Sequence, residues 1–139
     1  MYLKRVTMLL NGMTLAALTS LAAQQPAAAP AHKDTSAAGI TPALIARGDS
    51  VYHGQEAGGT CFACHGPEAK GQEGLAPDLT SGKWLNGDGS YRFIVRTVVE
   101  GVAKPKRAAA PMPPKGGAGL TPLDVRAVAA YVYSLGHPH

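Results

Sequence analysis

The run Cys61-Phe62-Ala63-Cys64-His65 constrains this chain more than any other feature, because it contains both of the chain's cysteines. Two thiols at this spacing, with a histidine directly after them, are typical of covalent haem attachment, in which each sulfur bonds one vinyl group of the haem. The histidine ring then reaches the iron as an axial ligand. We therefore predict one haem c, bound through Cys61 and Cys64 and ligated by His65.

Two other kinds of site use a Cys-x-x-Cys pair. A redox-active disulfide of the thioredoxin type lies near a strand-and-helix unit, and no alternating strand pattern leads into Cys61. A structural zinc site needs four ligands. His53 is nearby, but the sequence has no second pair of cysteines. The haem site is therefore favoured over both alternatives.

An export signal is expected at the N-terminus. Lys4 and Arg5 are followed by an apolar run over residues 6–21 and then by small alanines, which is the order found in secretory signal peptides. Polar residues interrupt the run, so a membrane span is a poorer fit. We predict a cleaved signal peptide over residues 1–23, with cleavage as late as Ala31 left open, and a periplasmic location. A retained membrane anchor is the less favoured alternative.

Composition divides the rest of the chain into two parts. Residues 24–39 are mostly Ala, Pro and Gln, which predicts a flexible spacer. Residues 40–139 form the predicted domain, which is small, rich in Gly and Pro and poor in aromatic residues. A domain of this size buries a modest share of its surface and often depends on a metal or a cross-link. A bound haem would complete its core.

The charge of the chain narrows the class of partner. The formal net charge of +4 includes the two cations of the predicted signal peptide, so the exported form carries 4 − 2, or +2. Nucleic-acid binding calls for a dense basic face or a groove-reading helix, and the sequence shows neither. No nucleic-acid partner is expected, and the mild positive charge favours at most an acidic docking partner.

Three helical segments are expected, over residues 41–54, 90–101 and 121–136. Each begins with Ser or Thr in the N-cap position and ends at a glycine. Between these signals, apolar residues recur at a spacing of three and four. No segment alternates well enough to predict a strand. The two long connections, residues 66–89 and 103–119, are explained if they wrap around a cofactor.

Four short motifs follow one another along the chain: Gly48-x-x-x-Tyr52, Cys61-x-x-Cys64-His65-Gly66, Gly74-Leu75-Ala76-Pro77-Asp78-Leu79 and Ala129-Ala130-Tyr131-Val132. In this order they resemble the class I c-type cytochromes of bacteria, in the short monohaem form rich in glycine. The resemblance implies an all-α fold, the small cytochrome c fold, with three main helices and long loops wrapped around one covalently bound haem.

The resemblance also implies that a methionine in the loop before the last helix is the second axial ligand. Met112 is the only methionine outside residues 1–23, and prolines on both sides restrict its backbone. A lone methionine more often fills a gap in a core, but Met112 lies in a Pro- and Gly-rich loop. His53 is too close to Cys61 in sequence to be expected on the opposite haem face. The other histidines are expected on the surface near the chain ends: His32, His137 and His139.

Further roles are implied by the same resemblance. The carbonyl of Pro77 is expected to accept a hydrogen bond from the free ring nitrogen of the axial histidine, as metal-bound histidines generally require an acceptor; an ordinary turn proline is the alternative. Trp84 is expected to line the haem pocket and to point its ring N–H toward a haem propionate, or to serve in packing alone. Gly48 and Tyr131 mark the predicted crossing of the first and last helices. Four more residues are candidates for the pocket wall: Leu79, Tyr91, Phe93 and Ile94.

The function that these features favour is one-electron transfer, with iron cycling between Fe(III) and Fe(II) under His/Met ligation in a periplasmic redox chain. The donor and acceptor proteins are not identified, and the basic residues Lys104, Lys106 and Arg107 are candidates for docking them. The alternative is a cytochrome subunit of a larger dehydrogenase or oxidase, including a membrane complex. A haem enzyme or sensor with an open iron position is less favoured. On its own the chain is expected to be a monomer or a subunit and not an enzyme.

Overall fold

The computed structural model describes residues 37–137, which belong to one compact unit. The predicted signal peptide, and the predicted spacer up to residue 36, lie outside these residues. The elements in chain order are η1 (Ala37–Gly39), α1 (Pro42–Tyr52), α2 (Cys61–His65), α3 (Tyr91–Glu100), η2 (Pro114–Gly117) and α4 (Pro122–Gly136). The all-α prediction is confirmed, and within residues 37–137 the only β-type pairing is two isolated bridges.

The three predicted long helices are confirmed, and side-chain caps explain where each one begins. The Thr41 hydroxyl accepts a hydrogen bond from the Leu44 amide at the start of α1, and Ser90 does the same for Phe93 at the start of α3. These bonds satisfy amide groups that have no partner inside the helix. Thr121 caps α4. Proline follows the cap of α1 and of α4, where its missing N–H costs nothing.

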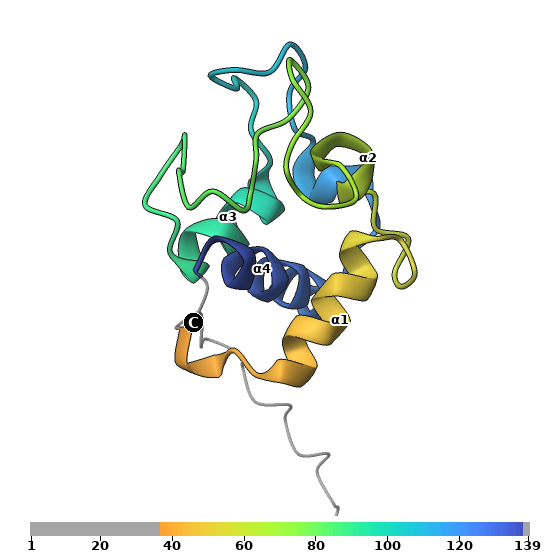
Figure 1. Cartoon of the computed structure of the whole chain (residues 1–139). Helices are drawn as coiled ribbons and strands as arrows, with labels where there is room; N and C mark the ends of the chain where they lie inside the picture. The colour runs from red at the N-terminus through yellow and green to blue at the C-terminus, as the bar shows by residue number, and fades with distance from the viewer. Residues whose placement is uncertain (1–36, 138–139) are drawn as a thin grey trace, which may run out of the picture. The chain divides into compact units, whose positions relative to one another are not determined.

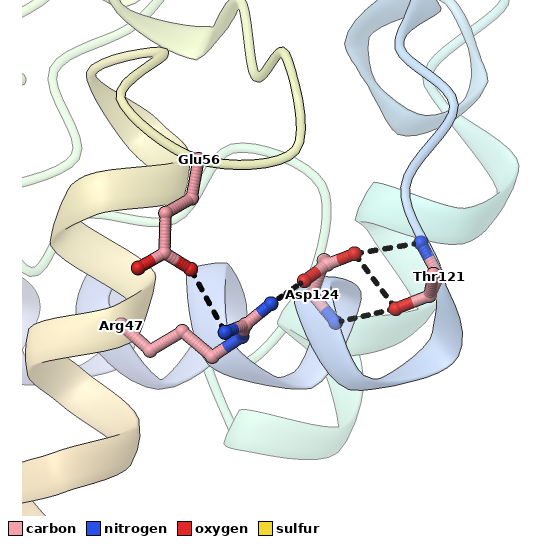
Figure 2. Close-up of polar contacts among 4 residues, drawn as sticks. All are labelled: Arg47, Glu56, Thr121 and Asp124. Atoms are coloured by element: carbon pink, nitrogen blue, oxygen red, sulfur yellow. Dashed lines mark hydrogen bonds and ion pairs between the residues drawn. The ribbon is translucent and has the colours of Figure 1, made fainter.

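The start of α4 is also the centre of a polar network that joins three segments of the chain (Figure 2). The Asp124 carboxylate accepts hydrogen bonds from the Thr121 amide at 3.0 Å and from the Thr121 hydroxyl at 2.7 Å. Its other oxygen lies 2.6 Å from Arg47 Nη2, and Arg47 Nη1 lies 2.8 Å from Glu56 Oε2. The network therefore ties α1 to the start of α4 and to the turn that leads toward Cys61.

Helices α1 and α4 cross at Gly48. A Cβ atom at this position would lie 2.0 Å from the Ala127 carbonyl oxygen and 2.9 Å from Tyr131 Cβ, so only glycine permits the backbones to approach this closely. This confirms the predicted crossing of Gly48 and Tyr131. Helix α4 lies between α1 and α3 and packs against both (Figure 1).

The core is built mainly on α4, which is buried over more than one side. Val128 and Val132 are buried, while Tyr131 and Leu135 are only partly buried. Ala127, Ala129 and Ala130 are buried as well, because neighbouring helices cover more than one face of α4. Val51 and Tyr52 of α1 and Ile94 and Val98 of α3 complete the core.

The short helix α2 was not predicted, because five residues are too few to display a helical period. It holds the whole Cys-x-x-Cys-His run. The long loops that follow α2 and α3 lie with it above the crossed helices in Figure 1. Two bonds connect these loops: the Ala109 amide donates to the Gly74 carbonyl at 2.9 Å, and Lys106 Nζ donates to the Leu85 carbonyl at 2.5 Å.

Candidate haem site

One cavity is bounded by α2, α3, α4 and the two long loops, and most of its wall is apolar. The structure brings all six predicted site residues to its wall: Cys61, Cys64, His65, Pro77, Trp84 and Met112. They come from four separate stretches of sequence, so their convergence is a property of the fold and not of a single motif.

The His65 ring is oriented by Pro77. His65 Nδ1 lies 3.0 Å from the Pro77 carbonyl oxygen. A carbonyl can only accept, so Nδ1 carries the hydrogen and Nε2 keeps its lone pair. Burial lowers the pKa of His65, and the Pro77 carbonyl acts in the opposite direction. The result is a neutral imidazole with one nitrogen free to bind a metal, which is the form that haem iron requires.

The two cysteines lie on the same short helix as His65. Both are free thiols; Cys61 is partly buried and Cys64 is exposed. Burial raises the pKa of the Cys61 thiol. Both sulfur-bearing residues line the cavity beside His65, and the two thiols and the ring are thus available to one planar group.

The C-terminal end of α1 fixes the segment that follows His65. The buried Tyr52 hydroxyl donates to the Gly66 carbonyl at 2.6 Å, and burial raises the pKa of this phenol. The next side chain, His53, places Nε2 2.8 Å from the Pro67 carbonyl. The His53 ring packs edge-on against Tyr52 and Tyr131. His53 does not line the cavity, as expected, and sequence patterns gave no signal of this contact with Pro67.

Met112 is held by an antiparallel bridge to Val102. The Val102 amide donates to the Met112 carbonyl at 2.9 Å, and the Met112 amide donates to the Val102 carbonyl at 3.1 Å. Gly101, just before the bridge, has φ of 70° and ψ of −166°. A Cβ there would lie 2.3 Å from the Met112 carbonyl oxygen. The end of α3 thus sets the position of the methionine backbone.

Trp84 lines the cavity, and two glycines make room for its ring. A Cβ at Gly89 would lie 2.0 Å from Trp84 Nε1, and a Cβ at Gly136 would lie 2.7 Å from Cζ2. The ring is nearly parallel to that of His137, with centroids 6.3 Å apart. The indole N–H edge therefore lies against Gly89. This arrangement favours packing, and the contact with a propionate stays a prediction.

Other wall residues divide into predicted and missed ones. Leu79, Phe93 and Ile94 line the cavity as expected, but Tyr91 does not; it is buried, and its hydroxyl donates to the Arg126 carbonyl. The missed residues include apolar side chains of α3, α4 and the loops and two charged residues: Leu75, Leu85, Val98, Val128, Val132, Asp78 and Lys83. Lys106 and Arg107, which were expected to dock a partner, also lie at the wall. A helical stripe predicts burial of such side chains, but not whether a helix or a cofactor covers them.

The residues present fit a c-type haem. The cavity offers two thiols, a neutral imidazole nitrogen and a thioether within apolar walls, and these are the groups that attach and ligate such a haem. Within residues 37–137 no group of three or more His, Cys, Asp or Glu side chains could hold a lone metal ion. In the same residues no helix is both long and apolar enough to span a bilayer.

Comparisons with known proteins agree with this description. The family model described as "Cytochrome C oxidase, cbb3-type, subunit III" matches residues 43–132. The CcoP subunit of the cbb3-type cytochrome c oxidase of Rubrivivax gelatinosus is 37% identical over 99 residues, which cover 70% of this chain and 28% of that protein. CcoP of Cereibacter sphaeroides is 35% identical over 95 residues, covering 68% and 28%. The chain therefore spans just over a quarter of the length of these relatives.

A solved structure supports the fold. The Kuenenia stuttgartiensis reducing HAO-like protein complex contains a chain that is 22% identical, with a TM-score of 0.51, and the similarity covers 69% of this chain and 45% of that one. The family match extends from α1 into the last turns of α4 and so includes the cavity and every helix that surrounds it. The chain belongs to the family of cbb3-type cytochrome c oxidase subunit III as an all-α cytochrome c domain, and membership of the cytochrome c family implies covalently bound haem c.

Proposed function

We propose that this chain is a monohaem, one-electron-transfer domain that works within or beside a membrane oxidase complex. The observation that carries the proposal is the convergence of His65, oriented by Pro77, and Met112 on one apolar cavity that also holds both cysteines. Haem c, when bound, supplies an iron that cycles between Fe(III) and Fe(II).

Each of the chain's own groups has a distinct task in this proposal. Cys61 and Cys64 would hold the group through two thioether bonds, and His65 Nε2 and the Met112 sulfur would ligate its iron. Pro77 keeps the imidazole in the correct tautomer and orientation. The apolar wall excludes water, and a thioether ligand raises the reduction potential.

Two protein ligands would leave no open position on the iron, so the chain would transfer electrons without binding a substrate. A haem enzyme or sensor needs that position open. Carbon monoxide added to the reduced protein separates these functions: the proposal expects little change in the absorption spectrum of the wild type and rapid binding in Met112→Ala. Fast binding to the wild type would favour the enzyme or sensor.

Association with an oxidase is favoured over a freely diffusing carrier, which was the first expectation from sequence. The relatives are named as subunits of cbb3-type cytochrome c oxidases. Lys83, Lys106 and Arg107 at the cavity wall outnumber the single carboxylate, Asp78. A surplus of positive charge there would steer an acidic redox partner toward the haem. The expected compartment is the periplasm.

Covalent attachment is tested on the exported protein. We expect an intact mass equal to the processed chain plus one haem, and reduced-minus-oxidised spectra typical of a c-type cytochrome. The double variant Cys61→Ser/Cys64→Ser should lose the added haem mass and the c-type spectrum. Ser81→Ala, a change in an exposed turn, should keep the mass and the spectrum. A wild-type mass equal to the bare polypeptide would overturn the proposal, and a mass with two haems would overturn its monohaem part.

The choice between subunit and carrier is tested in the native organism. Mild detergent extracts, separated on a native gel and stained for haem, should show this chain co-migrating with terminal oxidase activity. Haem staining only at the mass of the chain alone, recovered in the periplasmic fraction, would favour the free carrier.

A further inference from the structure

We propose that Thr60 is a positioning residue for Met112: its hydroxyl holds the methionine-bearing segment against the haem-attachment helix. This inference rests on the proposed His/Met ligation. Thr60 is the N-cap residue of α2 and directly precedes Cys61, yet its side chain does not cap the helix. Instead, Thr60 Oγ1 donates a hydrogen bond to the Gly116 carbonyl, 2.8 Å away.

The acceptor belongs to a tight turn that continues from the methionine. Gly116 lies in η2, whose residues Lys115, Gly116 and Gly117 all have positive φ. The turn is closed by a bond from the Gly116 amide to the Pro113 carbonyl at 3.0 Å and by one from Lys115 Nζ to the Leu120 carbonyl at 2.8 Å. A bond to Gly116 therefore restrains a compact unit that begins at Pro113, the neighbour of Met112.

The position of this bond is unusual because it joins the segments that carry the two axial ligands. Within residues 37–137 it is the only hydrogen bond between residues 60–65 and residues 112–117. The other bonds of Met112 lead to Val102. The bonds that fix His65 and its neighbour Gly66 lead to Tyr52, to Pro77 and to the amides of Ala69 and Gly71. Both Thr60 and Gly116 line the cavity.

The physical effect follows from competition for the iron. A ligand on a loop exchanges between a bound position and a displaced one, and an external ligand binds only when the loop ligand is displaced. A bond that exists only in the docked arrangement stabilises the bound position. One exposed hydrogen bond shifts such an equilibrium by roughly two- to tenfold.

Imidazole is a suitable probe, because it competes with a thioether for ferric haem iron. We would titrate imidazole into the purified, oxidised holoprotein and follow the Soret band. Thr60→Val removes the hydroxyl at nearly constant volume and should bind imidazole two- to tenfold more tightly than wild type. Thr60→Ser keeps the hydroxyl and should match wild type. Ser134→Ala removes a hydroxyl that donates to the Tyr131 carbonyl of α4, away from the cavity wall, and serves as the control.

A double-variant cycle separates failure of this inference from failure of the proposed ligation. In a Met112→Ala background, Thr60→Val should have no further effect on imidazole affinity. If Met112→Ala binds imidazole no better than wild type, the proposed ligation is wrong. If Met112→Ala binds imidazole more tightly than wild type but Thr60→Val and Thr60→Ser have equal imidazole affinity, only the proposed role of Thr60 is wrong. The role of Thr60 is also wrong if Thr60→Val still raises imidazole affinity in the Met112→Ala background. Thr60→Ala replaces Thr60→Val if the latter does not mature.

Discussion

The crossed helices and the cavity loops of this domain are stabilised in different ways. Where α1 meets α4, the backbones are in direct contact at Gly48, and the start of α4 has a capping box and an ion pair. The loops at residues 66–89 and 102–113 are instead connected by a few separate bonds around a cavity. The polypeptide alone supplies the packing of the helices, whereas the loops lack a core of their own. Changes in the helices should therefore alter stability, and changes in the loops should alter ligation.

The largest effect is expected at the helix crossing. Gly48→Ala places a methyl group 2.0 Å from the Ala127 carbonyl oxygen, and the two helices would have to separate. Although alanine favours a helix by about 1 kcal/mol, we expect a net loss of about 3 kcal/mol or more, measured by urea unfolding of the holoprotein. Gly119→Ala has open space around it and should be nearly neutral. Equal stability of the two variants would contradict the close packing.

A smaller loss is expected at Asp124, which is 2% exposed. Asp124→Ala removes the capping box and leaves Arg47 without this partner, at a cost of about 2–3 kcal/mol. Hydrogen bonds from Thr121 and then from Arg47 lower the pKa of the Asp124 carboxyl. A lowered pKa means that its contribution is present above the ordinary aspartate pKa and is lost as the pH falls through the folded-state value.

Measuring the stability of the protein as the pH is lowered tests this contribution of the Asp124 carboxylate. Wild type should lose stability more steeply than Asp124→Asn as the pH falls below the ordinary aspartate range, as followed by circular dichroism. Glu73→Gln is the control, because this carboxylate lies in an exposed turn. Parallel curves for wild type and Asp124→Asn would show that another group causes the acid response.

A change on the loop side should alter ligation as well as stability. Gly101→Ala forces alanine into a backbone conformation that is almost confined to glycine and brings a methyl group 2.3 Å from the Met112 carbonyl. We expect a loss of about 2 kcal/mol together with tighter imidazole binding to the ferric protein. Gly74→Ala also has positive φ but open space, so it should lose less stability and keep wild-type imidazole affinity. Unchanged imidazole affinity in Gly101→Ala would contradict the expected difference between the crossed helices and the cavity loops.

The smallest effect is expected at His53, where the helices and the loops meet. Both ring nitrogens face oxygen acceptors, at Asp49 and Pro67. The Pro67 carbonyl above all, and then Asp49, raise the pKa of His53 above its ordinary 6.5. A raised pKa means that the contribution is complete below pH 6.5 and is lost as the pH rises through the folded-state value.

His53→Gln should therefore cost about 1 kcal/mol at acidic pH and less at alkaline pH, measured by urea unfolding at several pH values. Tyr52→Phe is the matched control: it removes the neighbouring bond to Gly66, but its cost should not change over this pH range, because burial raises the pKa of the Tyr52 phenol. The Asp49 carboxylate, which also faces His53, is present in both variants. If the loss of unfolding free energy depended on pH equally in the two variants, His53 would not be the titrating group.

The sequence predicted those features that depend on neighbours along the chain. Caps and stop glycines located the three long helices, and the Cys-x-x-Cys-His run together with a single available methionine identified the residues that the cavity brings together. Contacts between distant segments had no such local signal, and two of them, His65 with Pro77 and Gly48 with Tyr131, were expected only from the family resemblance. Thr60 with Gly116, His53 with Pro67 and the two glycines beside Trp84 each pair residues whose types are common in loops. Only the folded geometry shows why those positions matter.

The crossing of α1 and α4 also has a consequence for biogenesis. These two helices lie at opposite ends of the described domain, with the Cys61–His65 helix between them. During passage through a membrane from the N-terminus onward, the thiols would arrive before α4, so the crossing could not yet have formed around them. In that order of events, both thiols would be accessible before the last helix closes the domain.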